Sequence, residues 1–157
     1  MKKLVLFLGL SVFIFANTLP HDLVCKKVPK SEIEDMMGIK FKEQRVGKLP
    51  IEPVYDLSFC EYISYVLPDV TIFYYPKCKS KLYFEDSEVK ELKDLKFPAR
   101  IVLDSKDKTS MIIGETKEGS KIMFLIRKGV KIDGKEYKKA LKLLEKLVME
   151  LKWKGYF

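Results

Sequence analysis

Apolar and polar positions divide the chain into an apolar run at its start and a mixed body behind it. Lys2 and Lys3 precede the apolar run from Leu4 to Phe15, and the small residue Ala16 follows it. This order of parts is typical of a secretory signal peptide. The run is shorter than the roughly 20 apolar residues that a membrane-spanning helix needs. We therefore expect cleavage after Ala16 and a periplasmic or secreted protein with no membrane span after cleavage.

The body behind this leader predicts a single domain. Residues 1–16 are the predicted signal peptide, residues 17–30 an N-terminal lead-in, and residues 31–157 one α+β domain. A chain of this size is long enough to bury one hydrophobic core. We expect no second domain, because no internal repeat or low-complexity segment interrupts the body.

The first elements of the domain are predicted from a capping pattern and an alternation. Ser31-Glu32-Ile33-Glu34 has the form of a capping box, and Gly38 follows as a stop signal. These signals predict a short helix over residues 31–37. Alternation over residues 39–46 then predicts a strand.

A β-hairpin is predicted next, from strands over residues 57–66 and 70–75 that are rich in β-branched and aromatic residues. A three-residue turn would place Cys60 opposite Cys78, whereas a two-residue turn would place Cys60 opposite Lys77. The sequence leaves both registers open.

The second half of the chain predicts an antiparallel meander and a closing helix. Residues 79–93 suggest a short strand followed by a helix from Ser87. Three strands over residues 100–103, 110–114 and 121–127 are separated by charged turns. Residues 134–152 have the spacing of an amphipathic helix, with apolar positions at Tyr137, Ala140, Leu141, Leu144, Val148 and Leu151. The predicted fold class is α+β: an antiparallel sheet with a short N-terminal helix and a long C-terminal amphipathic helix packed on it.

The charge composition is dominated by lysine. Of 30 basic residues, only Arg45, Arg100 and Arg127 are arginine, and the formal net charge is +8. Nucleic-acid surfaces usually depend on the forked guanidinium of arginine, so nucleic acid is an unfavoured partner. Asn17 and Gln44 are the only side-chain amides. Abundant lysine and glutamate with few amides are typical of proteins from thermophiles. We therefore expect the source organism to be a thermophile.

Three cysteines follow the leader: Cys25, Cys60 and Cys78. In an oxidising compartment two of them are expected to form a disulfide, and one thiol is left over. No C-x-x-C motif is present, and His21 is the single histidine. We therefore predict no metal site and no cofactor.

Two apparent catalytic motifs are weak. Gly114 to Lys121 imitates a phosphate-binding loop, with Ser120 and Lys121 in reversed order, but it joins two predicted strands instead of opening a helix. Ser105 and Lys108 form an S-x-x-K pattern, in a predicted exposed turn instead of a buried helix. We predict no catalytic residues, with a small periplasmic serine–lysine hydrolase as the alternative.

Aromatic side chains on the predicted hairpin are the best candidates for binding. Phe73-Tyr74-Tyr75 lies on one strand, with Tyr62 and Tyr65 on the other. Alternation should bury about half of these rings and leave the others for a surface patch. The candidate patch consists of Tyr62, Tyr74, Tyr75, Lys77 and Lys79. Such a patch suits an acidic glycan, an anionic lipid surface or an envelope protein, so we predict a non-catalytic binding or assembly module, with nucleic acid as the unfavoured ligand.

The order of elements also resembles a known group. Cys25, a helix ending in Met37-Gly38, Cys60-x-Tyr62 on a strand, a late meander and a closing helix resemble exported bacterial domains of unknown function with the α/β/α sandwich of the photosystem PsbP-type fold. The resemblance implies a Cys25–Cys60 disulfide, with Cys60–Cys78 as the alternative, and a non-catalytic role. The chain departs from the pattern in its extra Cys78 and in the prolines of the loop over residues 47–56.

Overall fold

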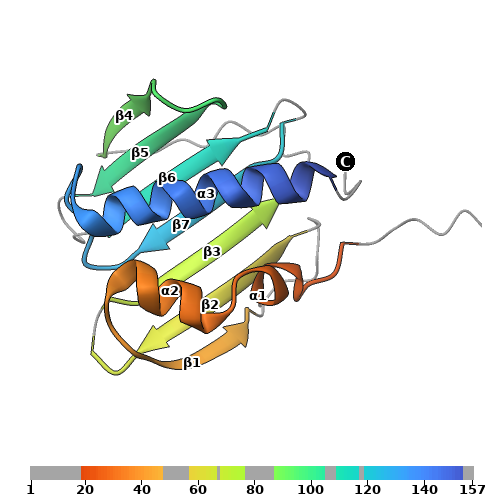
Figure 1. Ribbon diagram of the computed structural model, residues 1–157, viewed down its shortest axis with the longest axis vertical. Coiled ribbons are helices and arrows are strands. Elements are labelled where there is room, and N and C mark those ends of the chain that lie inside the picture. Colours follow the sequence, from red (N-terminus) through yellow and green to blue (C-terminus); the bar gives the residue numbers. More distant parts are fainter. Residues whose placement is uncertain are drawn as a thin grey trace, which may run out of the picture.

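Seven antiparallel strands form one sheet, and three helices of the described chain lie across one of its faces (Figure 1). The computed structural model describes residues 19–47, 57–66, 68–76, 87–104, 109–116 and 119–153. The strand order is β1-β2-β3-β7-β6-β5-β4. The elements are α1 (Leu23–Lys27), α2 (Lys30–Met37), β1 (Phe41–Val46), β2 (Ser58–Ser64), β3 (Val70–Tyr75), β4 (Glu88–Leu92), β5 (Ala99–Asp104), β6 (Thr109–Glu115), β7 (Lys121–Ile126) and α3 (Lys135–Trp153).

The α+β fold class is confirmed, with a pair of short N-terminal helices in place of one. The additional helix, α1, lies in the segment that the sequence describes only as a lead-in. Leu23 and Val24 of α1 are buried, and Val28 behind it is fully buried. A helix of five residues is too short to show a periodic pattern in the sequence. It also has little stability of its own and no side-chain cap, so it depends on its packing against β2.

The capping box predicted at Ser31 does not form. α2 begins at Lys30 behind Pro29, and no side chain caps its N-terminus. Glu34 instead binds the segment that follows α2. Its carboxylate accepts hydrogen bonds from the Phe41 backbone N–H at 3.1 Å and from Lys40 Nζ at 2.9 Å. These hydrogen bonds lower the pKa of Glu34. The predicted stop at Gly38 is confirmed by its left-handed φ of 69°.

The β2–β3 hairpin is confirmed, but both predicted registers are wrong. Cys60 lies opposite Ile72, and not opposite Cys78 or Lys77. The hairpin is centred nearer to β2 than expected, because Tyr62 pairs with Val70, and this moves the partner of Cys60 to residue 72. The predicted Cys60–Cys78 alternative therefore loses its geometric basis.

The helix predicted from Ser87 is wrong as well. Residues 88–92 form β4, an edge strand that pairs with β5 along its whole length, from Glu88 opposite Leu103 to Leu92 opposite Ala99. β4 is polar and exposed, as is common for edge strands. Its run of charged residues resembles the exposed face of a helix in sequence. The hydrogen-bonded pairing with β5 nevertheless makes it a strand.

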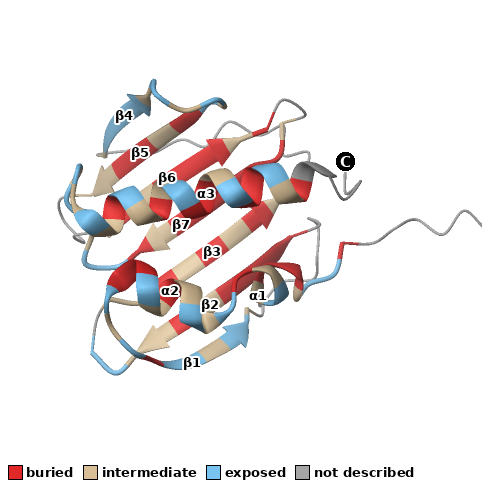
Figure 2. Cartoon of the chain, in the orientation of Figure 1, coloured by how far each residue is buried: buried red, intermediate tan, exposed pale blue. Residues whose placement is uncertain are grey.

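The meander of β5, β6 and β7 and the closing helix α3 are confirmed. α3 lies on β6 and β7, with its apolar stripe toward the sheet (Figures 1 and 2). Gly114 permits this close approach, because a Cβ at this position would lie 3.0 Å from both Leu144 Cδ1 and Phe97 Cε2. Any larger residue would push the helix or the Phe97 ring away.

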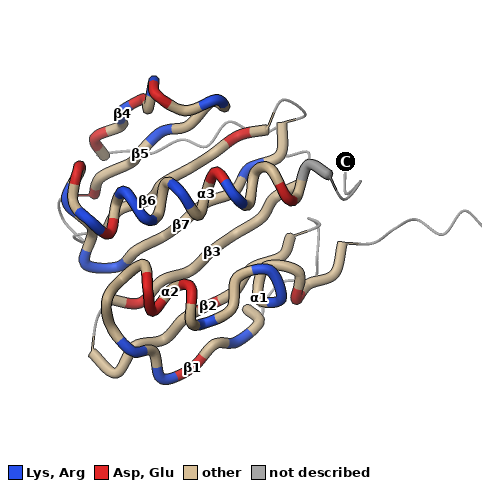
Figure 3. The backbone as a smooth tube through the Cα atoms, viewed as in Figure 1, with Lys and Arg blue, Asp and Glu red and all other residues tan. Residues whose placement is uncertain are grey.

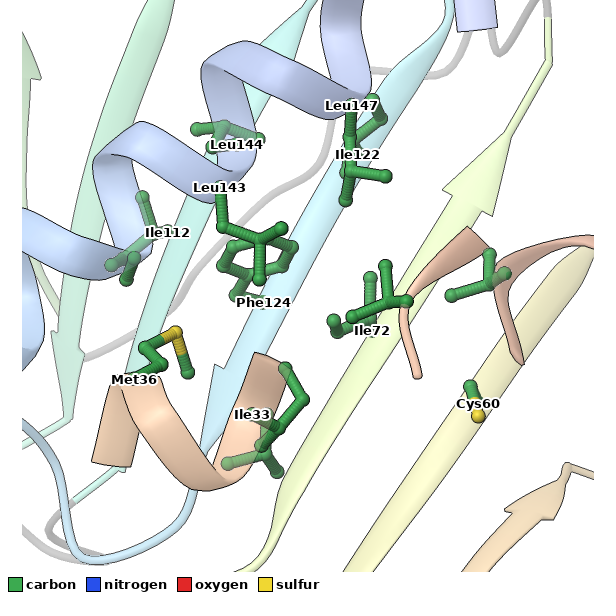
Figure 4. Close-up of a cluster of buried hydrophobic side chains, with 14 of the residues drawn as sticks. Ile33, Met36, Cys60, Ile72, Ile112, Ile122, Phe124, Leu143, Leu144 and Leu147 are labelled. Carbon is green, nitrogen blue, oxygen red and sulfur yellow. The ribbon is translucent and has the colours of Figure 1, made fainter. Parts of the chain in front are cut away.

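The main core lies between the helices and the sheet. Figure 4 shows Ile33 and Met36 of α2 and Leu143 of α3 gathered over Phe124 and Ile72 of the sheet. A smaller cluster on the opposite face of the sheet contains Val102, Ile113 and Met123, with Phe73, Tyr75 and Met111 packed against it.

The hydroxyl group of Tyr62 lies deep in the main core, and it makes the stability of the fold depend on pH in the alkaline range. Tyr62 is fully buried, its hydroxyl donates a 2.6 Å hydrogen bond to the Val28 carbonyl, and burial raises the pKa of this hydroxyl. The unfolded chain ionises this group near its ordinary pKa of about 10, while the folded chain keeps it protonated. Tyr62 therefore contributes stability below pH 10 that is lost as the pH rises further.

We expect Tyr62→Phe to lower the free energy of unfolding by about 1 kcal/mol at pH 7, through loss of the hydrogen bond. Above pH 10 the wild-type free energy of unfolding should fall more steeply than that of the variant, by up to about 1.4 kcal/mol per pH unit. Urea unfolding of both proteins between pH 8 and pH 11, chosen to bracket that ordinary pKa, measures this difference. Parallel pH profiles would contradict it.

Candidate functional site

The predicted tyrosine patch is not assembled on the surface. Tyr62 and Tyr74 are both 0% exposed, so they belong to the core and cannot contact a ligand. Side chains alternate between the two faces of a strand, and both of these rings lie on the face that the helices cover. Tyr75 is half-buried on the opposite face, where Phe73 stacks on it at 6.1 Å. Lys77 and Lys79 lie outside the described residues.

Of the two apparent catalytic motifs, the structure describes most of one. The segment from Gly114 to Lys121 joins β6 to β7, as the turn prediction requires, and no helix follows it. Ser105 and Lys108 lie outside the described residues. No group of three or more potential metal ligands occurs within the part of the chain that the structure describes.

The disulfide joins Cys25 of α1 to Cys60 of β2, with Cα atoms 5.0 Å apart. This is the pair that the family resemblance implies, and Cys78 lies outside the described residues. The Gln44 side-chain amide reinforces the junction, because it donates to the carbonyls of Cys25 at 2.8 Å and Val28 at 3.1 Å. The α1 segment is therefore tied firmly to the sheet.

Among the described residues, the most exposed large apolar side chains lie at the β2–β3 connection. Tyr65 is 74% exposed and Val66 is 78% exposed. No other two adjacent large apolar residues are exposed in the described ranges. The turn that carries them is ordered by hydrogen bonds, because Ser64 N–H donates to Asp69 Oδ1 at 2.9 Å and Ser64 Oγ donates to the Val66 carbonyl at 2.6 Å. These hydrogen bonds hold Ser64 against Val66 and Asp69.

A basic turn lies beside this connection. The Arg127 N–H, directly after β7, donates to the Asp69 carbonyl at 3.0 Å, and the Arg127 guanidinium lies 3.8 Å from the Asp69 carboxylate. Figure 1 shows the β2–β3 connection and the β7–α3 connection at the same end of the sheet, and Figure 3 shows the basic residues along the β7–α3 connection. The apolar pair therefore has cationic neighbours.

Lys128 in this turn has a conformation that lysine rarely adopts. Its φ is 73°, in the left-handed region, and Gly129 follows with φ 69°. A side chain in this region costs roughly 1–2 kcal/mol, which glycine would avoid. Residues in sparsely populated conformations cluster at functional sites. The strained position displays an exposed ammonium group.

A third irregularity occurs at the start of β1. Phe41 pairs with Ser64 and Glu43 pairs with Ile63, so Lys42 is an extra residue in the ladder with β2. Bulges of this kind re-aim a side chain and recur near binding sites. Lys42 is exposed and lies beside the end of β2 that leads into Tyr65. We name Lys42, Tyr65, Val66, Arg127 and Lys128 the tip site.

A shallow hollow between α2 and α3 is the alternative location. It has a volume of about 310 Å³, and Met36 and Leu143 form part of its lining. Two ion pairs bridge its walls, Lys139–Asp35 at 3.0 Å and Lys146–Glu32 at 2.6 Å. Lys142 also lines the hollow, which lies at the junction of the two helices.

No protein-family model matches the chain, and no curated protein or solved structure was found that matches it significantly. Within the described ranges, no helix is long and apolar enough to cross a membrane.

Proposed function

We propose that this protein is an exported, non-catalytic binding module that docks to a component of the cell envelope through the tip site. Export is supported by the signal-peptide pattern of residues 1–16 and by the Cys25–Cys60 disulfide, since disulfides persist in oxidising compartments. A thermophilic source belongs to the same proposal and is supported by the lysine- and glutamate-rich composition.

The observation that carries this proposal is the coincidence of three irregularities at one end of the sheet. Tyr65 and Val66 are exposed, Lys128 is left-handed, and Lys42 occupies a bulge. None of these features adds to the packing of the core. Exposed aromatic and basic residues are typical of contact sites, where tyrosine and arginine often dominate the binding energy.

The geometry favours docking over catalysis. Side chains that are three-quarters exposed cannot enclose a small substrate or exclude water from it. They can enter a partner or a surface that supplies the apolar environment.

Sedimentation with isolated envelope membranes of the source organism tests the proposal. We expect the disulfide-bonded protein to co-sediment, and Tyr65→Ser combined with Val66→Ser to weaken binding by about tenfold or more, because burial of one such side chain contributes about 1.5 kcal/mol or more. The matched control is Met149→Ser, since Met149 is 57% exposed near the far end of α3.

The control variant should bind like the wild type. Equal binding of the wild type, the tip variant and the control would overturn the role of the tip site. Circular dichroism of all three proteins shows whether each is folded, which we expect because the substituted side chains are exposed.

A further inference from the structure

We infer that the tip site contacts an anionic lipid surface. This inference rests on the proposed function, because it names the chemical class of the partner that the tip site binds. The apolar part consists of Tyr65 and Val66. A tyrosine ring with a polar hydroxyl is suited to the boundary between lipid headgroups and acyl chains, where one end of the side chain is apolar and the other is hydrated.

The cations around this apolar pair complement an anionic surface. Lys42 and Lys128 are exposed and have no ion-pair partner among the described residues. Arg127 is 64% exposed at its side chain and only loosely paired with Asp69, at 3.8 Å. Lysine is a compact point charge without the fork geometry for two-point recognition, so it suits a diffuse layer of phosphate groups.

Three acidic residues, Asp69, Glu43 and Asp133, lie in the same segments as the residues of the tip site. Asp69 accepts hydrogen bonds from the Ser64 N–H and the Ser64 hydroxyl, which use one of its oxygens. Asp133 and Glu43 are exposed nearby, so the surface is mixed at its margin. Unlike Arg127, Lys42 and Lys128 have no ion-pair partner among the described residues, so their ammonium groups are available to an anionic surface.

A lipid surface also fits the shape of the site better than a protein pocket or a glycan does. Tyr65 and Val66 are both about three-quarters exposed, and a flat, deformable surface can accept such an exposed pair of side chains without a matching cavity. Glycan recognition usually adds amide side chains to the stacking ring, and the one amide of the described chain, Gln44, is occupied with backbone groups of the core. Two apolar side chains with a few cations predict weak, reversible and salt-sensitive attachment.

Co-sedimentation with protein-free vesicles tests this inference. The probes are vesicles of mixed phosphatidylglycerol and phosphatidylcholine and vesicles of phosphatidylcholine alone. We expect the disulfide-bonded protein to bind the anionic vesicles, to bind the neutral ones at least about tenfold more weakly, and to lose affinity as salt is added.

The charge variant combines Lys42→Gln with Lys128→Gly, the latter chosen because glycine adopts the left-handed φ of this position without strain. It should weaken binding to anionic vesicles by roughly tenfold to thirtyfold, the effect of two cations near the surface. The matched control, Lys138→Gln with Lys142→Gln, removes two exposed lysines from α3 and should leave binding unchanged.

Three outcomes would overturn the lipid assignment: equal binding to both vesicle types, equal loss in the charge variant and its control, or no binding to vesicles. If envelope membranes retain the protein through Tyr65 and Val66 while vesicles do not, the proposed function stands and the partner is a protein or a glycan. If the tip variant also binds envelope membranes like the wild type, the proposed function fails with it.

Discussion

Replacing Cys25 and Cys60 together with alanine is expected to lower the free energy of unfolding by about 4 kcal/mol. The bond closes a loop with a sequence separation of 35 residues, and opening it restores conformational entropy to the unfolded chain. The same substitution loosens α1, whose Val24 N–H donates to the buried Ser58 hydroxyl at 3.0 Å. Loss of the covalent tie exposes this short helix to fraying, because it has little helical stability of its own.

Urea unfolding with and without a reductant measures this effect. Reduction should lower the free energy of unfolding of the wild type to nearly that of the alanine variant. The alanine variant should unfold at the same urea concentration with and without the reductant. A wild type with the same unfolding midpoint in both conditions would show that the disulfide does not stabilise the fold. Peptide mapping of the oxidised protein identifies the bonded pair independently.

The sequence predicts best the elements whose packing follows from a regular pattern. α3 and the strands β5, β6 and β7 are confirmed, because each has an unambiguous period of apolar residues. α1 could not be predicted, since five residues contain less than two helical turns. β4 has charges on both faces, so its conformation depends on pairing with β5, which no local pattern encodes.

The hairpin register failed for a related reason. A turn is predicted from Pro68 and Asp69, but the number of residues that leave the ladder depends on side-chain hydrogen bonds within the connection. Asp69 Oδ1 accepts from Ser64 N–H, a hydrogen bond between the two ends of the connection that no periodicity of apolar residues encodes. Both predicted registers therefore missed Ile72, the residue that lies opposite Cys60.

The tip site could be predicted only in part. Tyr65 belongs to the aromatic group that the sequence singles out, but alternation alone cannot say which face of a strand the helices cover. Tyr62 and Tyr74 therefore entered the predicted patch although both are core residues. Lys128 is remote from Tyr65 in the sequence, and only the pairing of β3 with β7 brings the two connections to one end of the sheet.

Replacing Phe124 with alanine is expected to lower the free energy of unfolding by about 3–5 kcal/mol, because it removes a large buried ring and leaves a cavity. Phe124 is 0% exposed, and it lies opposite Ile112 on β6 and Ile72 on β3. The same ring lies beneath Met36 and Leu143 of the two covering helices (Figure 4). A cavity here cannot be filled by one neighbour, since three strands and two helices hold its walls.

Leu125→Ala is the matched control for this substitution. Leu125 follows Phe124 on the same strand, but its side chain lies on the opposite face of the sheet and is only partly buried. We expect a cost of about 1–2 kcal/mol for the control, because it removes a smaller and less buried group. Urea unfolding of both variants measures the two costs. Equal costs would contradict the placement of the main core between the helices and β7, and with it the fixed position of the β7–α3 connection that presents Arg127 and Lys128 beside Tyr65 and Val66.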